Sequence, residues 1–164
     1  MPNRFLRHRA ALIRSLLAPC LVMAAMPALA RGTAGAAVAP EGIARPDCIA
    51  DPHTLCVEND RFSVRAAYQL TPDGPSVLAR AVRLTPNTGY FWFFDENNVE
   101  LIVKVLDGCG TSPSSFWFFA AGLTDVGVSI EVTDFRTTES RTYSNPVGTP
   151  FAPIQDTSTF TTCP

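Results

Sequence analysis

The sequence predicts an all-β fold, an antiparallel sandwich of immunoglobulin-like or similar type with about seven strands and two disulfides. Three observations predict it. Short apolar runs with a two-residue period alternate with clusters of turn residues, as expected for half-buried strands. No stretch beyond residue 30 shows the 3.6-residue period of an amphipathic helix. The four cysteines of that part of the chain form an even set, which favours a disulfide framework.

Three runs give the strongest strand signals, residues 61–69, 99–106 and 126–134. Apolar side chains recur at every second position and are expected to face the core: Phe62, Val64, Ala66, Tyr68, Val99, Leu101, Val103, Val105, Val126, Val128, Ile130 and Val132. A weaker run at 77–84, two aromatic runs at 90–94 and 116–120, and the run 139–143 complete the seven strands. The last of them is expected to pair back on 126–134 through a turn near Thr137 and Thr138.

An aromatic run, a polar turn and a valine-rich run occur twice in succession. Phe91-Trp92-Phe93-Phe94 precedes the first valine-rich run, and Phe116-Trp117-Phe118-Phe119 precedes the second. Two such units are too few for a solenoid. We therefore expect two hairpins, one in each sheet of the sandwich.

The first thirty residues have the three parts of a secretory signal. Residues 1–14 carry four arginines and no acid, residues 15–26 are apolar, and Ala28-Leu29-Ala30 is a signal-peptidase site. The apolar stretch is too short for a membrane-spanning helix and contains Pro19. Lipidation at Cys20 is the weaker alternative, because Pro19 occupies a position where a lipobox has a small residue. We expect cleavage after Ala30, a flexible Ala/Gly/Pro-rich spacer over residues 31–46, and one domain over residues 47–164 with a Pro-rich C-terminal tail.

Removal of this signal leaves nine basic and fifteen acidic residues, a net charge of −6. Lys104 is the only lysine. Such a chain has no basic patch to neutralise phosphates, which argues against nucleic-acid binding. We expect a secreted or periplasmic protein that does not associate with the membrane after signal cleavage. Its partner is expected to be a protein or a glycan at the cell exterior.

The cysteines beyond the signal are Cys48, Cys56, Cys109 and Cys163, and they allow three pairings. We favour Cys48–Cys56, because the two are close in sequence, and Cys109–Cys163, which would tie the end of the chain to a central loop. Zinc is the rival interpretation. The spacings differ from C-x₂-C, and His53 is the only histidine beyond the signal, so no metal or other cofactor is expected.

The sequence lacks a pattern typical of an enzyme. A triad would need His53 to meet a nucleophile such as Ser112, Ser114 or Ser115, which lie in a Gly/Pro loop without a nucleophile-elbow motif. Nothing singles out a carboxylate pair such as Asp95 and Glu100 for glycoside hydrolysis. The turn Asp95-Glu96-Asn97-Asn98 offers oxygen ligands for calcium, but it lacks the glycine and distal glutamate of an EF-hand. We expect no catalytic residues.

The aromatic runs are the candidate binding residues. Neighbouring side chains of a strand point to opposite faces, so Phe91 and Phe93 share one face and Phe116 and Phe118 correspond to them in the second run. The opposite faces carry the candidate binding residues Tyr90, Trp92, Phe94, Trp117 and Phe119. One possibility is that the tail from Asn145 to Cys163, which shows no strand pattern, covers this second set. The alternatives are an exposed patch for a protein partner and an aromatic platform for sugars.

A distinctive motif runs through residues 88–95 (TGYFWFFD), 98–101 (NVEL) and 103–108 (VKVLDG). Together with residues 54–56, 61–64, 116–119 and 141–143, it resembles an uncharacterised β-domain of secreted bacterial proteins. The resemblance covers roughly residues 48–164. It implies export and a β-fold, and it supplies no catalytic residues.

These observations favour a non-catalytic structural or protein-interaction module. A carbohydrate-binding module that uses the aromatic strands is the second hypothesis, and a small secreted hydrolase is a distant third. Tryptophans beside polar groups would favour sugar binding, whereas an apolar patch without polar neighbours would favour a protein partner.

Overall fold

The computed structural model describes residues 47–164, so the predicted signal and spacer lie outside the described residues. The described chain has ten β-strands and no helix. The predicted all-β fold is therefore confirmed, with three more strands than the sequence indicated. Within these residues no helix is long and apolar enough to cross a membrane.

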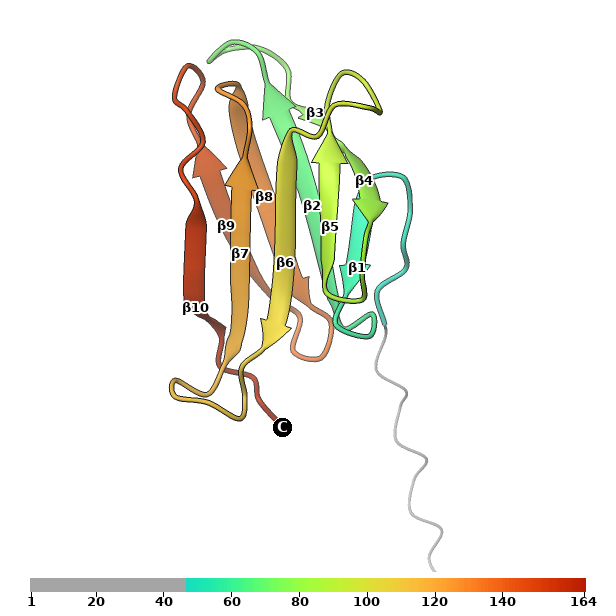
Figure 1. Ribbon diagram of the computed structural model, residues 1–164, viewed down its shortest axis with the longest axis vertical. Coiled ribbons are helices and arrows are strands. Elements are labelled where there is room, and N and C mark those ends of the chain that lie inside the picture. The colour runs from blue at the N-terminus through green and yellow to red at the C-terminus, as the bar shows by residue number, and fades with distance from the viewer. Residues whose placement is uncertain (1–46) are drawn as a thin grey trace, which may run out of the picture. The chain divides into compact units, whose positions relative to one another are not determined.

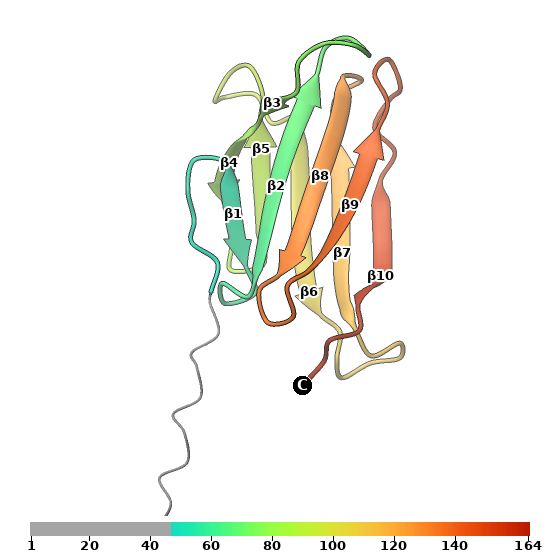
Figure 2. The ribbon, with the colours of Figure 1, turned by 180° about the vertical axis from the view of Figure 1, so that it is seen from behind.

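The strands form two five-stranded antiparallel sheets, which face each other as two layers (Figures 1 and 2). The sheet that faces the viewer in Figure 1, here the front sheet, has the order β10 (Ile154–Phe160), β7 (Phe116–Gly122), β6 (Leu101–Asp107), β5 (Thr88–Trp92) and β4 (Arg80–Arg83). The back sheet, seen in Figure 2, has the order β1 (Thr54–Val57), β2 (Phe62–Gln69), β8 (Gly127–Asp134) and β9 (Glu139–Asn145), and β3 (Val77–Leu78) also pairs with β2.

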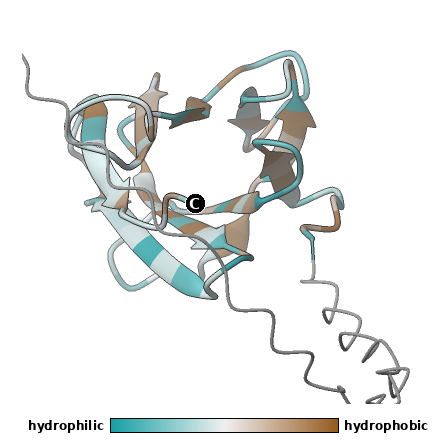
Figure 3. Ribbon diagram, turned by 90° about the horizontal axis from the view of Figure 1, so that it is seen from below, coloured by the Kyte–Doolittle hydropathy of each residue, from teal (hydrophilic) through white to brown (hydrophobic). Residues whose placement is uncertain are grey.

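The core lies between the sheets and follows the alternation read from the sequence. Viewed along the strands, hydrophobic and hydrophilic residues alternate within the two layers (Figure 3). Phe62, Val64 and Ala66 of β2 are buried, as are Val128, Ile130 and Val132 of β8. Val99 was expected to face inward with β6 and does not, because that strand begins only at Leu101.

Aromatic pairs join the two sheets across the core. Phe62 of the back sheet packs against Phe116 of the front sheet, with ring centroids 4.9 Å apart. Phe118 stacks on Tyr143 at 4.8 Å, and Tyr68 stacks on Phe93 at 4.7 Å. Offset aromatic pairs add about 0.5–1.5 kcal/mol each beyond the area they bury. The inward half of each aromatic run thus holds the two layers together.

Two expectations about the chain path were wrong. The tail forms an edge strand, β10, which pairs with β7, and its Phe160 lies in the core 5.3 Å from the ring of Phe62. The second aromatic run does not form a hairpin with the valine-rich run that follows it. β7 belongs to the front sheet and β8 to the back sheet, so the chain crosses between the layers there.

Both expected disulfides are present. Cys48 is bonded to Cys56, and Cys109 is bonded to Cys163. Cys109 lies in the loop between β6 and β7, so the second disulfide fixes the residues after β10 to the end of the front sheet.

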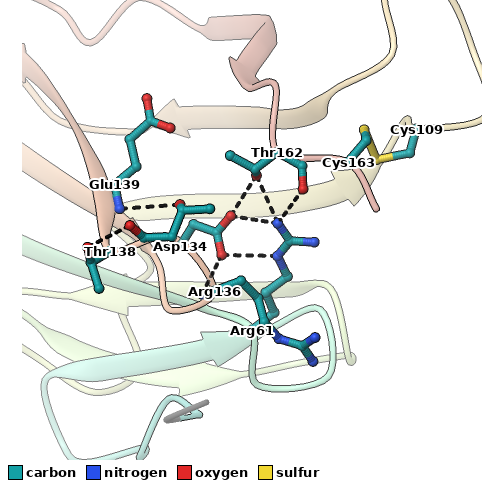
Figure 4. A network of polar contacts seen from close by, with 9 residues as sticks. Arg61, Cys109, Asp134, Arg136, Thr138, Glu139, Thr162 and Cys163 are labelled. Carbon is teal, nitrogen blue, oxygen red and sulfur yellow. Dashed lines mark hydrogen bonds and ion pairs between the residues drawn. A yellow bond between two sulfur atoms is a disulfide. The ribbon is translucent and has the colours of Figure 1, made fainter. Parts of the chain in front are cut away.

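A buried polar network lies close to the second disulfide (Figure 4). The guanidinium of Arg61 donates through Nε and Nη2 to the two oxygens of Asp134, at 3.0 and 2.6 Å. Thr162 donates through Oγ1 to the same carboxylate at 2.6 Å, and its carbonyl accepts from Arg61 at 2.9 Å. Burial alone would raise the pKa of Asp134, but the bonds from Arg61, Thr162 and the Arg136 N–H outweigh it and lower that pKa. The network therefore links the residue before β2, the last residue of β8 and the chain after β10.

Candidate functional site

The candidate site is the outer face of the front sheet, the side turned away from the core. Residues paired across strands lie on the same face of a sheet, so the ladder registers identify its members. They are Arg80, Val82 and Leu84 from β4 and the turn after it, Thr88, Tyr90 and Trp92 from β5, Ile102, Lys104 and Leu106 from β6, Trp117, Phe119 and Ala121 from β7, and Gln155 from β10. All of them are exposed or half-buried.

This outer face is rich in apolar and aromatic side chains. Ile102 is 42% exposed and Leu84 is 55% exposed. The outer face of the back sheet is different, because its strands present mainly hydroxyl and charged groups: Arg65, Ser129, Glu131, Thr133, Ser140, Thr142 and Ser144. The sandwich therefore has one outer face suited to water and one that is largely apolar.

The structure places four of the five predicted binding residues on this face. Tyr90, Trp92, Trp117 and Phe119 are half-buried and alternate with buried residues along β5 and β7. The fifth, Phe94, was expected to share the face of Trp92 and does not. β5 ends at Trp92, so alternation no longer holds, and the ring of Phe94 lies edge-on to Tyr68 of the back sheet at 5.1 Å.

The two tryptophans lie far apart. Phe91 pairs with Leu101, which puts Trp92 level with Glu100, whereas Trp117 pairs with Leu106. Six residues of strand separate these levels, or roughly 20 Å at a rise of about 3.4 Å per residue. The tryptophans therefore mark opposite ends of the face and do not form a single stacking platform.

Trp117 is fixed by close packing. A Cβ added to Gly108 would lie 2.4 Å from the indole ring, so only glycine leaves room for this ring against the backbone. The indole Nε1 is buried and has no hydrogen-bond partner among the described residues. Trp117 is therefore a packing residue at one end of the outer face. Trp92 lies at the other end, beside the edge strand β4.

A shallow depression of about 300 Å³ lies in the middle of the face. Ala121 provides a small side chain between the larger Ile102 and Phe119, and Pro153 and Gln155 border it on the β10 side. The sequence suggested that the tail covers the outer aromatic residues. Instead, the tail borders the depression through Pro153 and Gln155, while its Phe151 and Phe160 pack into the core. The depression is open to solvent and mainly apolar.

Lys104 lies at the border of this depression. Its ammonium is 4.8 Å from the ring centroid of Phe119, within the range of a cation–π contact. Thr88 and Gln155, which flank Lys104 and Phe119 in the same row across the sheet, are neutral. Lys104 is not part of any ion pair found among residues 47–164. Sequence reasoning noted this lysine as the only one but could not place it on the aromatic face.

The residues considered for hydrolysis are engaged separately. The His53 ring is bonded through Nδ1 to the carbonyl of Ala79 at 2.8 Å. Ser114 and Ser115 donate to the carbonyls of Cys109 and Thr157, at 2.8 and 2.6 Å. None of these contacts joins the histidine to a serine.

The candidate carboxylates are also held by local contacts. Asp95 accepts from the backbone N–H of Asn97 at 2.8 Å, which is an ordinary turn contact. Glu100 accepts from the side-chain amide of Asn98 at 2.5 Å. In the part of the chain that the structure describes, no three His, Cys, Asp or Glu side chains gather in a way that could hold a metal ion.

Comparisons with protein-family models, with curated proteins and with solved structures found no match for this chain.

Proposed function

We propose that the mature chain is a secreted, non-catalytic protein-interaction module whose contact surface is the outer face of the front sheet. The observation that carries this proposal is the difference between the two outer faces. Exposed apolar patches of soluble proteins commonly mark interaction sites. The back sheet presents hydroxyl groups and charges at the equivalent positions, so sandwich construction does not by itself require an apolar exterior.

Export is part of the proposal. Two disulfides are typical of chains that fold in an oxidising compartment, and residues 1–30 have the pattern of a cleaved signal. N-terminal sequencing of the exported protein should find Arg31 first. A product that retains Met1, or one that carries lipid on Cys20, would contradict this part of the proposal.

A second function, carbohydrate binding, is favoured by one observation. Thr88, Lys104 and Gln155 provide hydrogen-bonding groups in the row that contains Phe119. Sugar sites combine an aromatic ring with several such groups. The remaining members of the face are mainly aliphatic and aromatic, and its tryptophans are roughly 20 Å apart along the strands. For these reasons we place the protein partner first.

Site-specific photo-crosslinking tests the proposal. A photoreactive residue at position 102 should capture a defined protein in the cells that export the chain. The matched control is the same residue at position 142, which is exposed on the back sheet and should capture nothing. Equal capture from both positions would refute the assignment of the face. Glycan-array binding that is lost on Trp92→Ala would favour the carbohydrate module instead.

A further inference from the structure

We propose that the partner is a polypeptide segment in which a carboxylate lies next to a large apolar side chain. The carboxylate pairs with Lys104, and the apolar side chain enters the depression above Ala121. This inference rests on the proposed function and specifies what the outer face of the front sheet recognises. Shape, charge and the shortage of hydrogen-bonding groups each contribute to it.

The shape of the depression fits one side chain. Its volume of about 300 Å³ is at the lower end of the range for small-molecule pockets. Ala121 forms the floor of the depression. Ile102 lies across from it on β6, and Phe119 lies two residues before it on the same face of β7. Because the depression is open, a linear segment can lie across it without any movement of β7 or β10.

The charge of the site is opposite to that of the protein. Residues 47–164 contain six arginines and one lysine against fourteen acidic residues. Lys104 is the positive charge beside the depression, and neither Thr88 nor Gln155 neutralises it. An ammonium on an apolar surface attracts a carboxylate more strongly than one surrounded by water, because the local dielectric constant is lower. The face therefore complements an acidic and apolar ligand.

The same charge argues against a second copy of this chain. A two-fold dimer built on this depression would place the two Lys104 side chains near each other within an apolar interface. Like charges in such a position disfavour association.

A sugar acid would satisfy the ammonium, but only Thr88 and Gln155 offer neutral hydrogen-bonding side chains at the depression. A polypeptide, which brings its own apolar side chain, matches the lining better.

A displayed library of random peptides, selected on the purified disulfide-bonded mature chain, tests this inference. We expect the selected peptides to share an Asp or Glu next to Leu, Ile, Phe or Trp. Lys104→Met should weaken their binding by about tenfold, equivalent to about 1.4 kcal/mol. Lys104→Arg should retain most of the affinity, and raised ionic strength should reduce the difference between the lysine and the methionine forms.

Ala121→Trp fills the depression without changing a core position and should abolish binding. Thr142→Trp is the matched control on the back sheet and should bind as the unmodified chain does. Peptides that lack an acid and bind Lys104→Met equally well, yet fail on Ala121→Trp, would overturn this inference and leave the proposed function in place. If no peptide binds, or if Ala121→Trp has no effect, both are overturned. Glycan-array binding to acidic sugars that requires Lys104 would replace the polypeptide with a carbohydrate.

Discussion

Replacing Arg61 with Met should strongly destabilise the domain, because it leaves the carboxylate of Asp134 buried without its cation. The side chain of Asp134 is fully buried and that of Arg61 is 12% exposed, so the pair is almost completely desolvated. Removal of one partner from a buried pair costs about 3–5 kcal/mol, and the residual exposure of Arg61 points to the lower end. Loss of the guanidinium over the Phe116 ring, 4.1 Å from its centroid, adds about 0.5–1 kcal/mol.

We therefore expect Arg61→Met to lower the free energy of unfolding by roughly 4 kcal/mol, out of a total of about 5–15 kcal/mol. The corresponding fall in melting temperature is roughly 10–20 °C for a domain of this size. Urea denaturation followed by tryptophan fluorescence measures the free energy of unfolding directly. Because the pKa of Asp134 is lowered in the folded state, its contribution is present above the unfolded pKa of about 3.9 and is lost as pH falls through the folded pKa. The difference between the variant and the unmodified chain should shrink in acid.

The matched control is Arg83→Met, which breaks the exposed pair between Arg83 and Asp60. These side chains are 45% and 50% exposed and 3.3 Å apart, so the loss should not exceed about 1 kcal/mol. Replacing both buried partners, in Arg61→Met with Asp134→Leu, should cost less than Arg61→Met alone. The reasoning is refuted if Arg61→Met costs no more than the control, or if the double variant is the least stable of all.

Other predictions concern the disulfides and two ionisable groups. Serine at both positions of the Cys109–Cys163 disulfide should cost about 4 kcal/mol and the same change in Cys48–Cys56 about 2.6 kcal/mol, and the reverse order in urea melts would contradict the loop-length argument. Glu58 has φ 52°, and its buried Oε1 has no hydrogen-bond partner within residues 47–164, so Glu58→Gly should stabilise the domain by about 1 kcal/mol. Burial raises the pKa of Glu58, so the folded state is destabilised when this carboxyl is charged. The stability gained by Glu58→Gly should therefore be larger at neutral pH than below the unfolded pKa of Glu58. Thermal melts that show an equal or smaller gain at neutral pH would exclude the buried charge as a cause. Burial, with the bond to Asp156, raises the pKa of Tyr143 to about 12. The stabilising effect of the neutral Tyr143 hydroxyl should therefore persist to about pH 10 and vanish towards pH 12. An ultraviolet titration in which Tyr143 loses its proton near pH 10 would disprove this prediction.

The sequence was most informative where a strand is buried on one face only. The alternation in β2 and β8 identified both strands and their inward residues, and the positive φ of Thr138 lies at the turn expected before β9. β1 is only four residues long and was missed. The alternation also separated the buried and outer aromatic residues correctly, except at Phe94, where the strand had already ended.

Pairing could not be predicted in the same way. Alternation shows which side chains are buried but not which strand lies alongside, so the crossing from β7 to β8 looked like a hairpin. β10 was missed because its inward positions include Asp156, which accepts a hydrogen bond from Tyr143, and because its register with β7 shifts before Phe160. A polar residue whose hydrogen-bond partner lies on another strand cannot be recognised as inward-facing from the sequence of its own strand.

The candidate site depends on pairing even more strongly. The outward direction of Trp117 and Phe119 follows from their own strand. The position of Lys104 beside Phe119 and Gln155 depends on the registers of two different ladders. The sequence therefore predicted which aromatic residues face outward, but not the depression or the charge beside it.

The positions of the disulfides also determine how the domain would respond to tension. Cys48 and Cys163 are each one residue from an end of the described domain, and the start of this domain and its C-terminus lie at the same end of the sandwich (Figure 1). A pulling force applied at these two residues would pass through the disulfides to Cys56 and Cys109. The covalent path under load would then contain only residues 56–109, and β7 to β10 would bear force only through their contacts with neighbouring strands. Forced unfolding is governed by the unfolding rate. Under load the domain would therefore lengthen by no more than the chain from Cys56 to Cys109 permits, until a disulfide is reduced.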